Sequence, residues 1–237
     1  MKLTTVLFDL DGTLLPMDQD EFVKGYFGLL AKKLSPLGYE PEKLTAAIWE
    51  GVAAAVKNDG SCSNEERFWQ RFCGIFGDKA LEDKPCFDEF YANEFQQAKA
   101  FCGYDPKAAQ AVALAKDLGY ELVLATNPIF PKISTESRIR WAGLEPRDFR
   151  MYTTYENASY CKPNGAYFRQ ILDELGLKGE ECIMVGNDAG EDTPAAELGM
   201  RVFLLTDNLI NKDGRDISAY PQGGFDELMD YLRRERA

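Results

Sequence analysis

Histidine is absent from the 237 residues of this chain. Its absence excludes Ser/His/Asp triads, histidine-activated cysteines and every metal site that needs an imidazole ligand. Catalysis would therefore depend on carboxylates, lysine, hydroxyls or thiols. Cysteine pairs of the C-x-x-C type are also missing, which disfavours a zinc site and a disulfide scaffold. The cysteines are scattered and are expected to be buried or idle thiols: Cys62, Cys73, Cys86, Cys102, Cys161 and Cys182.

Long hydrophobic runs are lacking too. The apolar stretch of residues 3–10 is already interrupted by Asp9, so it fits neither a signal peptide nor a membrane-spanning helix. We therefore expect a cytoplasmic protein without membrane contact. Basic residues are fewer than acidic ones, 27 against 39, and the formal net charge is -12. Because nucleic-acid affinity comes mainly from lysine and arginine, a surface that coats nucleic acid is not expected.

The residues that are present are those of an ordinary globular protein, with 45% hydrophobic and 28% charged residues. At about 150 residues per domain, the length predicts one large domain or a core with a companion. Short apolar runs alternate with helical stretches, a pattern typical of parallel β-α-β units. The runs predicted as strands are residues 4–10, 121–126, 182–186 and 201–206, with a weaker one at 150–154. The predicted helices among them are residues 106–118, 133–142, 164–175 and 192–198.

The alternation is interrupted between the first and second predicted strands. Four helical segments follow one another there, at residues 20–34, 42–57, 64–76 and 87–99. The sequence therefore predicts an α/β fold with a doubly wound parallel sheet, formed by residues 1–16 and 101–237, and an inserted all-α domain at residues 17–100. We call residues 17–100 the insert and expect it to act as a lid over the strand ends.

Polar residues follow the predicted strands. In an open parallel sheet, ligands bind beyond the carboxyl ends of the strands, so these residues are expected to meet at one edge. They are Asp9 and Asp11 after the first strand, Thr126 and Asn127 after the second, Lys162 in a later loop, and Asn187, Asp188 and Asp192 after the fourth.

The chemistry of this set points to phosphoryl transfer. Two nearby carboxylates repel each other unless a cation or a shared proton compensates them. With carboxylates and no histidine, Mg²⁺ is the expected ion. A carboxylate beside Mg²⁺ can attack phosphorus, while a second exchanges a proton with the leaving oxygen. Thr126 and Asn127 would then donate hydrogen bonds to the nonbridging oxygens, and Lys162 would supply a fixed positive charge.

At these residues the sequence resembles the haloacid dehalogenase superfamily of aspartate-nucleophile phosphohydrolases. The matching motifs are Asp9-Leu-Asp11-Gly-Thr13, Thr126-Asn127, Lys162-Pro163 and Gly186-Asn-Asp188-Ala-Gly-Glu-Asp192. The resemblance implies that Asp9 forms an aspartyl-phosphate and binds Mg²⁺. It implies that Asp11 is the general acid and base and gives its backbone carbonyl to the metal. Thr126 and Lys162 would hold the phosphoryl oxygens, Asp188 would complete the metal site, and Asp192 would support it or Lys162.

One position departs from the pattern of many relatives, which have aspartate where this chain has Asn187. Either Asn187 or Asp188 is then the inner-sphere ligand, and Asp188 is favoured because a carboxylate compensates Mg²⁺ better than an amide. Asp11 bears on the reaction class. Relatives that displace halide from carbon lack an acid at this place, so the chain resembles a phosphatase or a phosphotransferase.

The leading hypothesis is hydrolysis of a small phosphorylated metabolite. A sugar phosphomutase, a signalling receiver domain and a non-catalytic protein that binds phosphate or Mg²⁺ are the alternatives. The receiver domain is disfavoured because such domains are about half this length and carry the phosphoacceptor after a later strand. Neither the substrate nor the oligomeric state follows from the sequence. Arg138 and Arg140 are expected on the solvated face of their helix, and the substrate-facing candidates in the insert are Lys24, Tyr26, Trp49, Arg67 and Trp69.

Overall fold

The computed structural model of the chain describes residues 2–236 and is built around a parallel sheet. Its strand order is β3-β2-β1-β4-β5-β6, and every pair of neighbouring strands is parallel. This is the doubly wound order, in which the connections diverge on either side of β1. The strands are β1 (Thr5–Phe8), β2 (Glu121–Leu124), β3 (Met151–Tyr152), β4 (Cys182–Gly186), β5 (Arg201–Leu205) and β6 (Gln222–Gly223).

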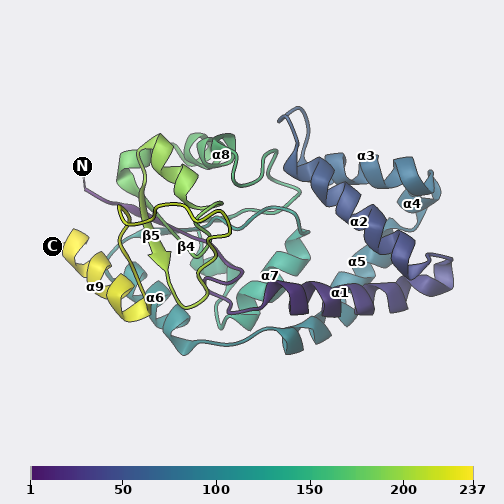
Figure 1. Cartoon of the computed structure of the whole chain (residues 1–237), viewed down its shortest axis with the longest axis horizontal. Coiled ribbons are helices and arrows are strands. Elements are labelled where there is room, and N and C mark those ends of the chain that lie inside the picture. The colour runs from purple at the N-terminus through teal and green to yellow at the C-terminus, as the bar shows by residue number, and fades with distance from the viewer. Residues whose placement is uncertain (1, 237) are drawn as a thin grey trace.

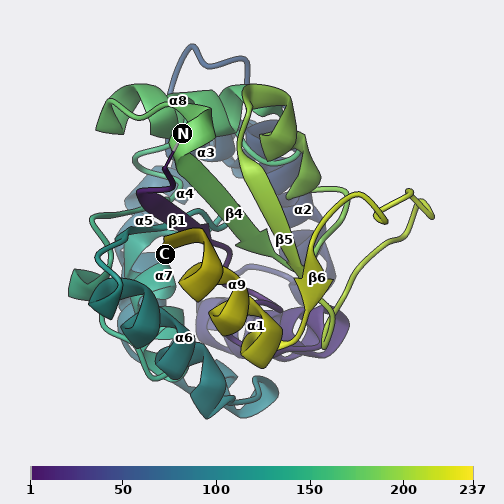
Figure 2. The ribbon, with the colours of Figure 1, turned by 90° about the vertical axis from the view of Figure 1, so that its left-hand side faces the viewer.

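Both faces of the sheet are buried, which explains why its strands are continuous apolar runs. On β1, Val6 and Phe8 belong to one hydrophobic cluster and Leu7 belongs to the other. The first cluster includes side chains of α6 (Pro106–Asp117), α7 (Lys132–Trp141) and α9 (Phe225–Arg236). The second includes those of α8 (Gly165–Leu175) and η5 (Thr193–Leu198). Figure 2 shows α6 and α9 packed side by side on one face and α8 on the other.

The insert forms a separate set of helices at the other end of the molecule from the sheet (Figure 1). Its first helix, α1, begins after Asp18, whose side chain accepts a hydrogen bond from the Glu21 backbone, as an N-cap residue should. The helices are α1 (Gln19–Leu34), η1 (Ser35–Leu37), α2 (Pro41–Val56), α3 (Asn64–Phe76), α4 (Lys79–Glu82), α5 (Lys84–Ala92) and η2 (Glu94–Phe101).

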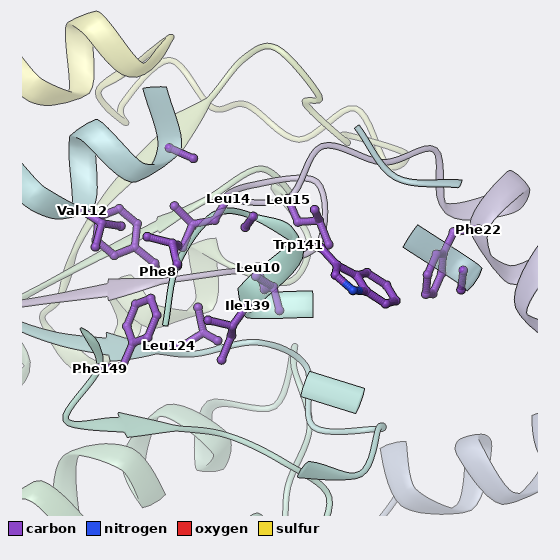
Figure 3. Packing of buried hydrophobic residues seen from close by; sticks show 14 of the residues in the cluster. Phe8, Leu10, Leu14, Leu15, Phe22, Val112, Leu124, Ile139, Trp141 and Phe149 are labelled. Atoms are coloured by element: carbon purple, nitrogen blue, oxygen red, sulfur yellow. The ribbon is translucent and has the colours of Figure 1, made fainter. Parts of the chain in front are cut away.

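One hydrophobic cluster is continuous from the sheet into the insert. Phe8 of β1 and Ile139 of α7 lie in it together with Phe22 of α1 (Figure 3). At the junction, the rings of Phe95 in η2 and Trp141 in α7 stack with centroids 5.1 Å apart. The insert therefore packs on the core through aromatic side chains.

The two chain segments that join the insert to the core run side by side. Met17 and Cys102 form an antiparallel bridge, and the Gly103 N–H donates to the carbonyl oxygen of Pro16 at 2.7 Å. A Cβ at Gly103 would lie 3.1 Å from the Pro16 Cβ, closer than ordinary contact. Glycine at this position allows the two segments to pair.

Several predicted elements differ in the structure. The segment predicted as one helix at residues 87–99 is divided between α5 and η2, with Asn93 outside helical geometry between them. The helix predicted at residues 192–198 is the 3-10 helix η5, which has Pro194 in its first turn. The C-terminal helix α9, the short α4 and the strand β6 were not predicted. The remaining predicted helices and strands are present with ends shifted by a few residues.

Candidate active site

The polar residues predicted to meet at one sheet edge line one cavity, with the exception of Lys162, which contacts two of the lining residues. The cavity has a volume of about 220 Å³ and lies beyond the carboxyl ends of β1, β2 and β4. Because β1 lies between β2 and β4, this is the switch point where ligands bind in doubly wound sheets. Its polar lining consists of Asp9, Asp11, Gln19, Thr126, Asn127, Asn187, Asp188, Glu191 and Asp192.

The Lys162 ammonium group binds two of these carboxylates, those of Asp9 and Asp192. Its ammonium nitrogen lies 2.9 Å from Asp9 Oδ1 and 2.7 Å from Asp192 Oδ1, and its side chain is fully buried. Burial lowers the pKa of Lys162, but the carboxylates of Asp192 and Asp9 outweigh that effect and hold the pKa well above its usual value. Lys162 therefore stays charged and fixes the position of Asp9.

Gly186, at the end of β4, makes room for this arrangement. A Cβ at Gly186 would lie 2.0 Å from Asp192 Oδ2, which no packing tolerates. The same Asp192 oxygen accepts a hydrogen bond from the Asp188 backbone N–H at 3.0 Å. Both Asp192 oxygens are thus engaged, one by Lys162 and one by the backbone.

Thr13 contacts both the first and the fourth motif. Its hydroxyl lies 3.0 Å from Asp9 Oδ2 and 2.9 Å from Asn187 Oδ1, and the single proton can be donated to one of them at a time. The Asn187 amide nitrogen donates to the carbonyl oxygen of Asn208 at 2.8 Å. Gly12 has a positive φ of 82°, and a Cβ there would lie 2.4 Å from that nitrogen. Hydrogen bonds therefore hold both the oxygen and the nitrogen of the Asn187 side-chain amide.

Asp11 forms an ion pair that the sequence analysis missed. Arg138, predicted on the solvated face of its helix, is instead fully buried and donates to Asp11 Oδ2. Its guanidinium lies 4.3 Å from the centroid of the Phe130 ring. The prediction for Arg138 was wrong because α5 and η2 of the insert pack against α7. Arg140, on the same helix, is exposed as predicted.

The other side of the Asp11 carboxyl group lies at the cavity. Burial raises the pKa of Asp11, and the charge of Arg138 lowers it by less, so that the pKa lies above its ordinary value. Among residues 2–236, Asp11 Oδ1 finds no hydrogen-bond partner. One oxygen of this carboxylate is therefore anchored and the other is unpaired.

Glu191 is a further acidic residue of the cavity to which the sequence analysis gave no role. Its carboxylate accepts from the Asn127 amide nitrogen, at 3.2 Å and 3.1 Å to its two oxygens. Burial raises the pKa of Glu191 to about 7. In this structure the Asn127 donor is therefore occupied by Glu191. The sequence did contain a signal for Glu191, because this residue lies inside the fourth motif, three residues after Asp188.

Thr126 is fixed through its backbone. Its carbonyl oxygen accepts hydrogen bonds from the hydroxyls of Thr153 and Tyr167, at 2.6 Å and 2.9 Å. The Thr126 residue is buried and still lines the cavity. The hydroxyls of Thr153 and Tyr167 thus fix the position of the Thr126 backbone at the edge of the sheet.

The donor set of the cavity fits a hard divalent cation. The carboxylates that line it outnumber the ammonium and guanidinium groups bound to them, namely Lys162 and Arg138. Asp188 Oδ1 accepts from the backbone of Gly190 and Glu191, and its second oxygen has no hydrogen bond to any of residues 2–236. Within the described chain, no three acidic or cysteine side chains converge as a metal cluster. Mg²⁺ does not need one, because it typically takes one or two carboxylates together with water and phosphate oxygens.

Asn64 links the insert to two loops of the site. Its buried side chain donates to the carbonyl oxygens of Pro128, at 3.2 Å, and Tyr160, at 3.3 Å. Pro128 follows the second motif and Tyr160 precedes Lys162. The Asn64 oxygen accepts from the Asn58 side chain at 3.0 Å. The start of α3 is thereby joined to both loops.

The substrate-facing candidates of the insert divide into two groups. Tyr26, Trp49 and Trp69 line a second cavity beside the first. Lys24 is exposed, and Arg67 is bound to Asp59 and Ser61 at the surface. Of these candidates, Trp49 also lines the cavity at the sheet edge, whereas Lys24 and Arg67 line neither cavity.

Residues 3–199 match the family described as haloacid dehalogenase-like hydrolase. The chain belongs to the haloacid dehalogenase-like hydrolases. A glyceraldehyde 3-phosphate phosphatase of Methanocaldococcus jannaschii is 30% identical over 130 residues, which are 54% of this chain and 56% of that protein. The chain thus matches about half the length of this curated relative. The family match therefore confirms that the chain is a hydrolase.

Solved structures of the family share the fold. A 2-haloacid dehalogenase from Pseudomonas syringae matches with a TM-score of 0.65 at 17% identity, covering 98% of this chain and 99% of its own. YfnB from Bacillus subtilis, solved with bound magnesium, matches with a TM-score of 0.57 at 17% identity, covering 98% and 99%. These likenesses confirm the α/β fold. None of the helices within residues 2–236 has the length and apolarity needed to cross a membrane.

Proposed function

We propose that the chain hydrolyses small phosphomonoesters in a Mg²⁺-dependent reaction through an aspartyl-phosphate on Asp9. The observation that carries this proposal is the fixing of Asp9 by buried Lys162 at the switch point of the sheet. A carboxylate held in this way faces a cavity of about 220 Å³, which has room for a phosphoryl group. Thr126 would donate a hydrogen bond to its oxygens.

Asp9, Asp188 and the backbone carbonyl of Asp11 would hold Mg²⁺. Asp188 is preferred over Asn187 because one Asp188 oxygen has no hydrogen bond, whereas the Asn187 oxygen accepts from Thr13. Asp192 is bound by Lys162 and the backbone, which supports a role in positioning Lys162. When bound, the ion would neutralise charge on the phosphoryl oxygens and on the attacking carboxylate.

The reaction would proceed in two steps. In the first, an Asp9 oxygen attacks phosphorus while the bond from phosphorus to the ester oxygen breaks, and Asp11 donates its proton to that oxygen. In the second, water attacks the phosphorus, Asp11 accepts a proton from the water, and the bond to Asp9 breaks. Inorganic phosphate leaves and Asp9 is regenerated. The side chain of Asp11 would turn from Arg138 toward the cavity to transfer these protons.

The insert, at residues 17–100, would act as a cap that excludes water between turnovers. Side chains of α1 and α2 reach the lining of the catalytic cavity, among them Phe22 and Trp49. The hydrogen bonds of Asn64 would keep this cap in register with the loops that carry Thr126 and Lys162. A closed apolar lining strengthens the electrostatic interactions inside it.

Release of inorganic phosphate from acetyl phosphate and 4-nitrophenyl phosphate tests the proposal. The purified chain should release phosphate with Mg²⁺ and lose activity with a chelator, and the Asp9→Asn variant should be inactive. Asp173→Asn, an exposed aspartate of α8, is the matched control and should retain activity. Acid-quenched protein should carry one added phosphoryl group on Asp9. Unchanged activity of Asp9→Asn would refute the mechanism, and transfer of phosphate to a sugar instead of water would indicate a phosphomutase.

A further inference from the structure

A second cavity adjoins the proposed phosphate site. It has a volume of about 80 Å³ and lies between the insert and the segment that follows Asn127. The two cavities share the lining residues Val23, Trp49, Ile129 and Phe130. A molecule whose phosphoryl group lies at Asp9 would therefore extend toward this second cavity.

The walls of the second cavity are almost wholly apolar. Aromatic and branched side chains of α1, α2, α3 and α5 form most of them, including Phe27, Ile48 and Phe68. The hydroxyls of Tyr26 and Tyr91 are hydrogen-bonded to each other at 2.7 Å. Burial raises the pKa of Tyr26 well above its usual value and that of Tyr91 to about 12, so both stay neutral.

Positive charge is absent from these linings. Within residues 2–236, no lysine or arginine lines either cavity, and the only charged side chain of the second is Asp88. A carboxylate or second phosphate on the substrate would lose its water there without gaining a counter-ion. It would also meet Asp88 and the carboxylates around Asp9.

We propose that the alcohol released from the phosphomonoester is uncharged and apolar, with at most one aromatic ring or a branched alkyl chain. This inference rests on the proposed function. The size limit follows from volume, because the second cavity, at about 80 Å³, is smaller than the apolar cavity of about 150 Å³ that binds benzene. A ring would therefore lie partly in the second cavity and partly between the shared lining residues Trp49 and Phe130, with its ester oxygen in the larger cavity. Phosphorylated acids and bisphosphates would be poor substrates.

Two esters with alcohols of similar reactivity provide the test. We expect kcat/KM for benzyl phosphate to exceed that for phosphoglycolate by about 100-fold, because burying one ring contributes on that order. Acetyl phosphate, whose leaving group is too small to need the second cavity, measures phosphoryl transfer alone. Turnover of acetyl phosphate with a preference for phosphoglycolate would overturn the inference and leave the proposed function standing.

Two substitutions in the insert test whether the second cavity is the source of the preference for benzyl phosphate. Trp49 lines both cavities, so Trp49→Ala should lower the ratio of benzyl phosphate to acetyl phosphate activity. Leu81 is an exposed apolar residue of the insert outside both linings, so Leu81→Ala is the matched control and should leave the ratio unchanged. An unchanged ratio in Trp49→Ala would overturn the assignment of this cavity.

A binding measurement decides the question without turnover. 2-Phenylethylphosphonate and 3-phosphonopropionate, in which a methylene group replaces the ester oxygen, are non-hydrolysable analogues of the two esters, and their binding in the presence of Mg²⁺ can be followed by calorimetry. We expect the dissociation constant of 2-phenylethylphosphonate to be lower by about 100-fold, for the same burial of one ring. Equal or reversed affinities would refute the inference even if the chain released no phosphate at all, an outcome that would separately refute the proposed function.

Discussion

Arg138 pairs with Asp11 from inside the protein. The guanidinium has no solvent exposure, whereas the Asp11 side chain keeps 23% of its surface exposed. The cation is therefore held by the fold, by the Phe130 ring and by Thr135, while the carboxylate lies at the boundary of the cavity. We infer that Arg138 is a positioning residue, which sets the starting orientation of Asp11.

Replacement of Arg138 should be costly. Arg138→Met removes one partner of a largely buried ion pair, and we expect a loss of about 3 kcal/mol in the free energy of unfolding. It should also lower kcat and shift the pH profile of the reaction, because Asp11 loses the nearby positive charge. Urea unfolding and steady-state kinetics measure the two effects.

The neighbouring arginine of the same helix supplies the control for that measurement. Arg140→Met removes an exposed guanidinium and should change the free energy of unfolding by no more than about 0.5 kcal/mol. Arg138→Lys keeps the charge without the planar geometry and should recover part of the pH profile. Equal effects of the Arg138 and Arg140 replacements would contradict the positioning role.

Gly186 offers a second prediction. A Cβ in Gly186→Ala would collide with the Asp192 carboxylate and displace it from Lys162. Because displacing a catalytic group by about 1 Å can cost 100-fold in rate, we expect a loss of activity of about that size. Phosphate release under saturating substrate measures it.

Gly28 is the matched glycine for this experiment. It lies inside α1 with no atom within 4 Å of its ideal Cβ. Gly28→Ala should therefore raise the free energy of unfolding by about 0.5–1 kcal/mol and leave phosphate release intact. If Gly186→Ala released phosphate as fast as Gly28→Ala, the room that Gly186 leaves for the Asp192 carboxylate would not be needed for activity.

Asn64 is predicted to hold the insert on the core. Asn64→Asp replaces an amide that donates to the carbonyls of Pro128 and Tyr160 with a carboxylate that repels them. We expect the free energy of unfolding to fall by about 3 kcal/mol, since a buried charge would be left unpaired. Asn93→Asp makes the same change at an exposed residue of the insert and should be nearly neutral. Similar urea midpoints for the two variants would show that Asn64 does not anchor the insert.

The metal ligands can be separated by two further substitutions. Asp188→Asn should weaken Mg²⁺ binding by about tenfold or more, because it removes a carboxylate from the cavity. Asn187→Ala should instead lower stability by about 1–2 kcal/mol, through loss of its hydrogen bonds to Thr13 and Asn208. Calorimetric titration of Mg²⁺ with each variant measures the affinities. A larger loss of affinity in Asn187→Ala would make the amide the inner ligand.

Much of the core was predictable because its signals are local. Strands β1, β4 and β5 are buried on both faces, so they appear in the sequence as uninterrupted apolar runs. The polar residues of the site follow these strands directly, and the geometry of a parallel sheet brings them together. That Asp9 and Asp188 line the same cavity could therefore be expected from the sequence.

What could not be predicted depends on contacts distant in sequence. The burial of Arg138 results from the packing of α5 and η2 against α7, which no pattern within α7 indicates. The strand β6 has two residues and owes its existence to pairing with β5. The helix α9 is a different case. Phe225, Leu228 and Leu232 are spaced as one buried helical face, so its signal was present and was passed over.

The chain enters and leaves the insert through two adjacent segments, which are paired by the bridge between Met17 and Cys102 and by the hydrogen bond from Gly103 to Pro16. The entropy of closing such a loop depends only weakly on its length, so halving or doubling the intervening chain would alter it by about 0.6 kcal/mol. A helical module whose two ends lie equally close could be grafted at this junction if it also replaced the contacts of Asn64 with the loops of the site and those of α5 and η2 with α7. Selectivity for the alcohol could in that way be exchanged as a unit.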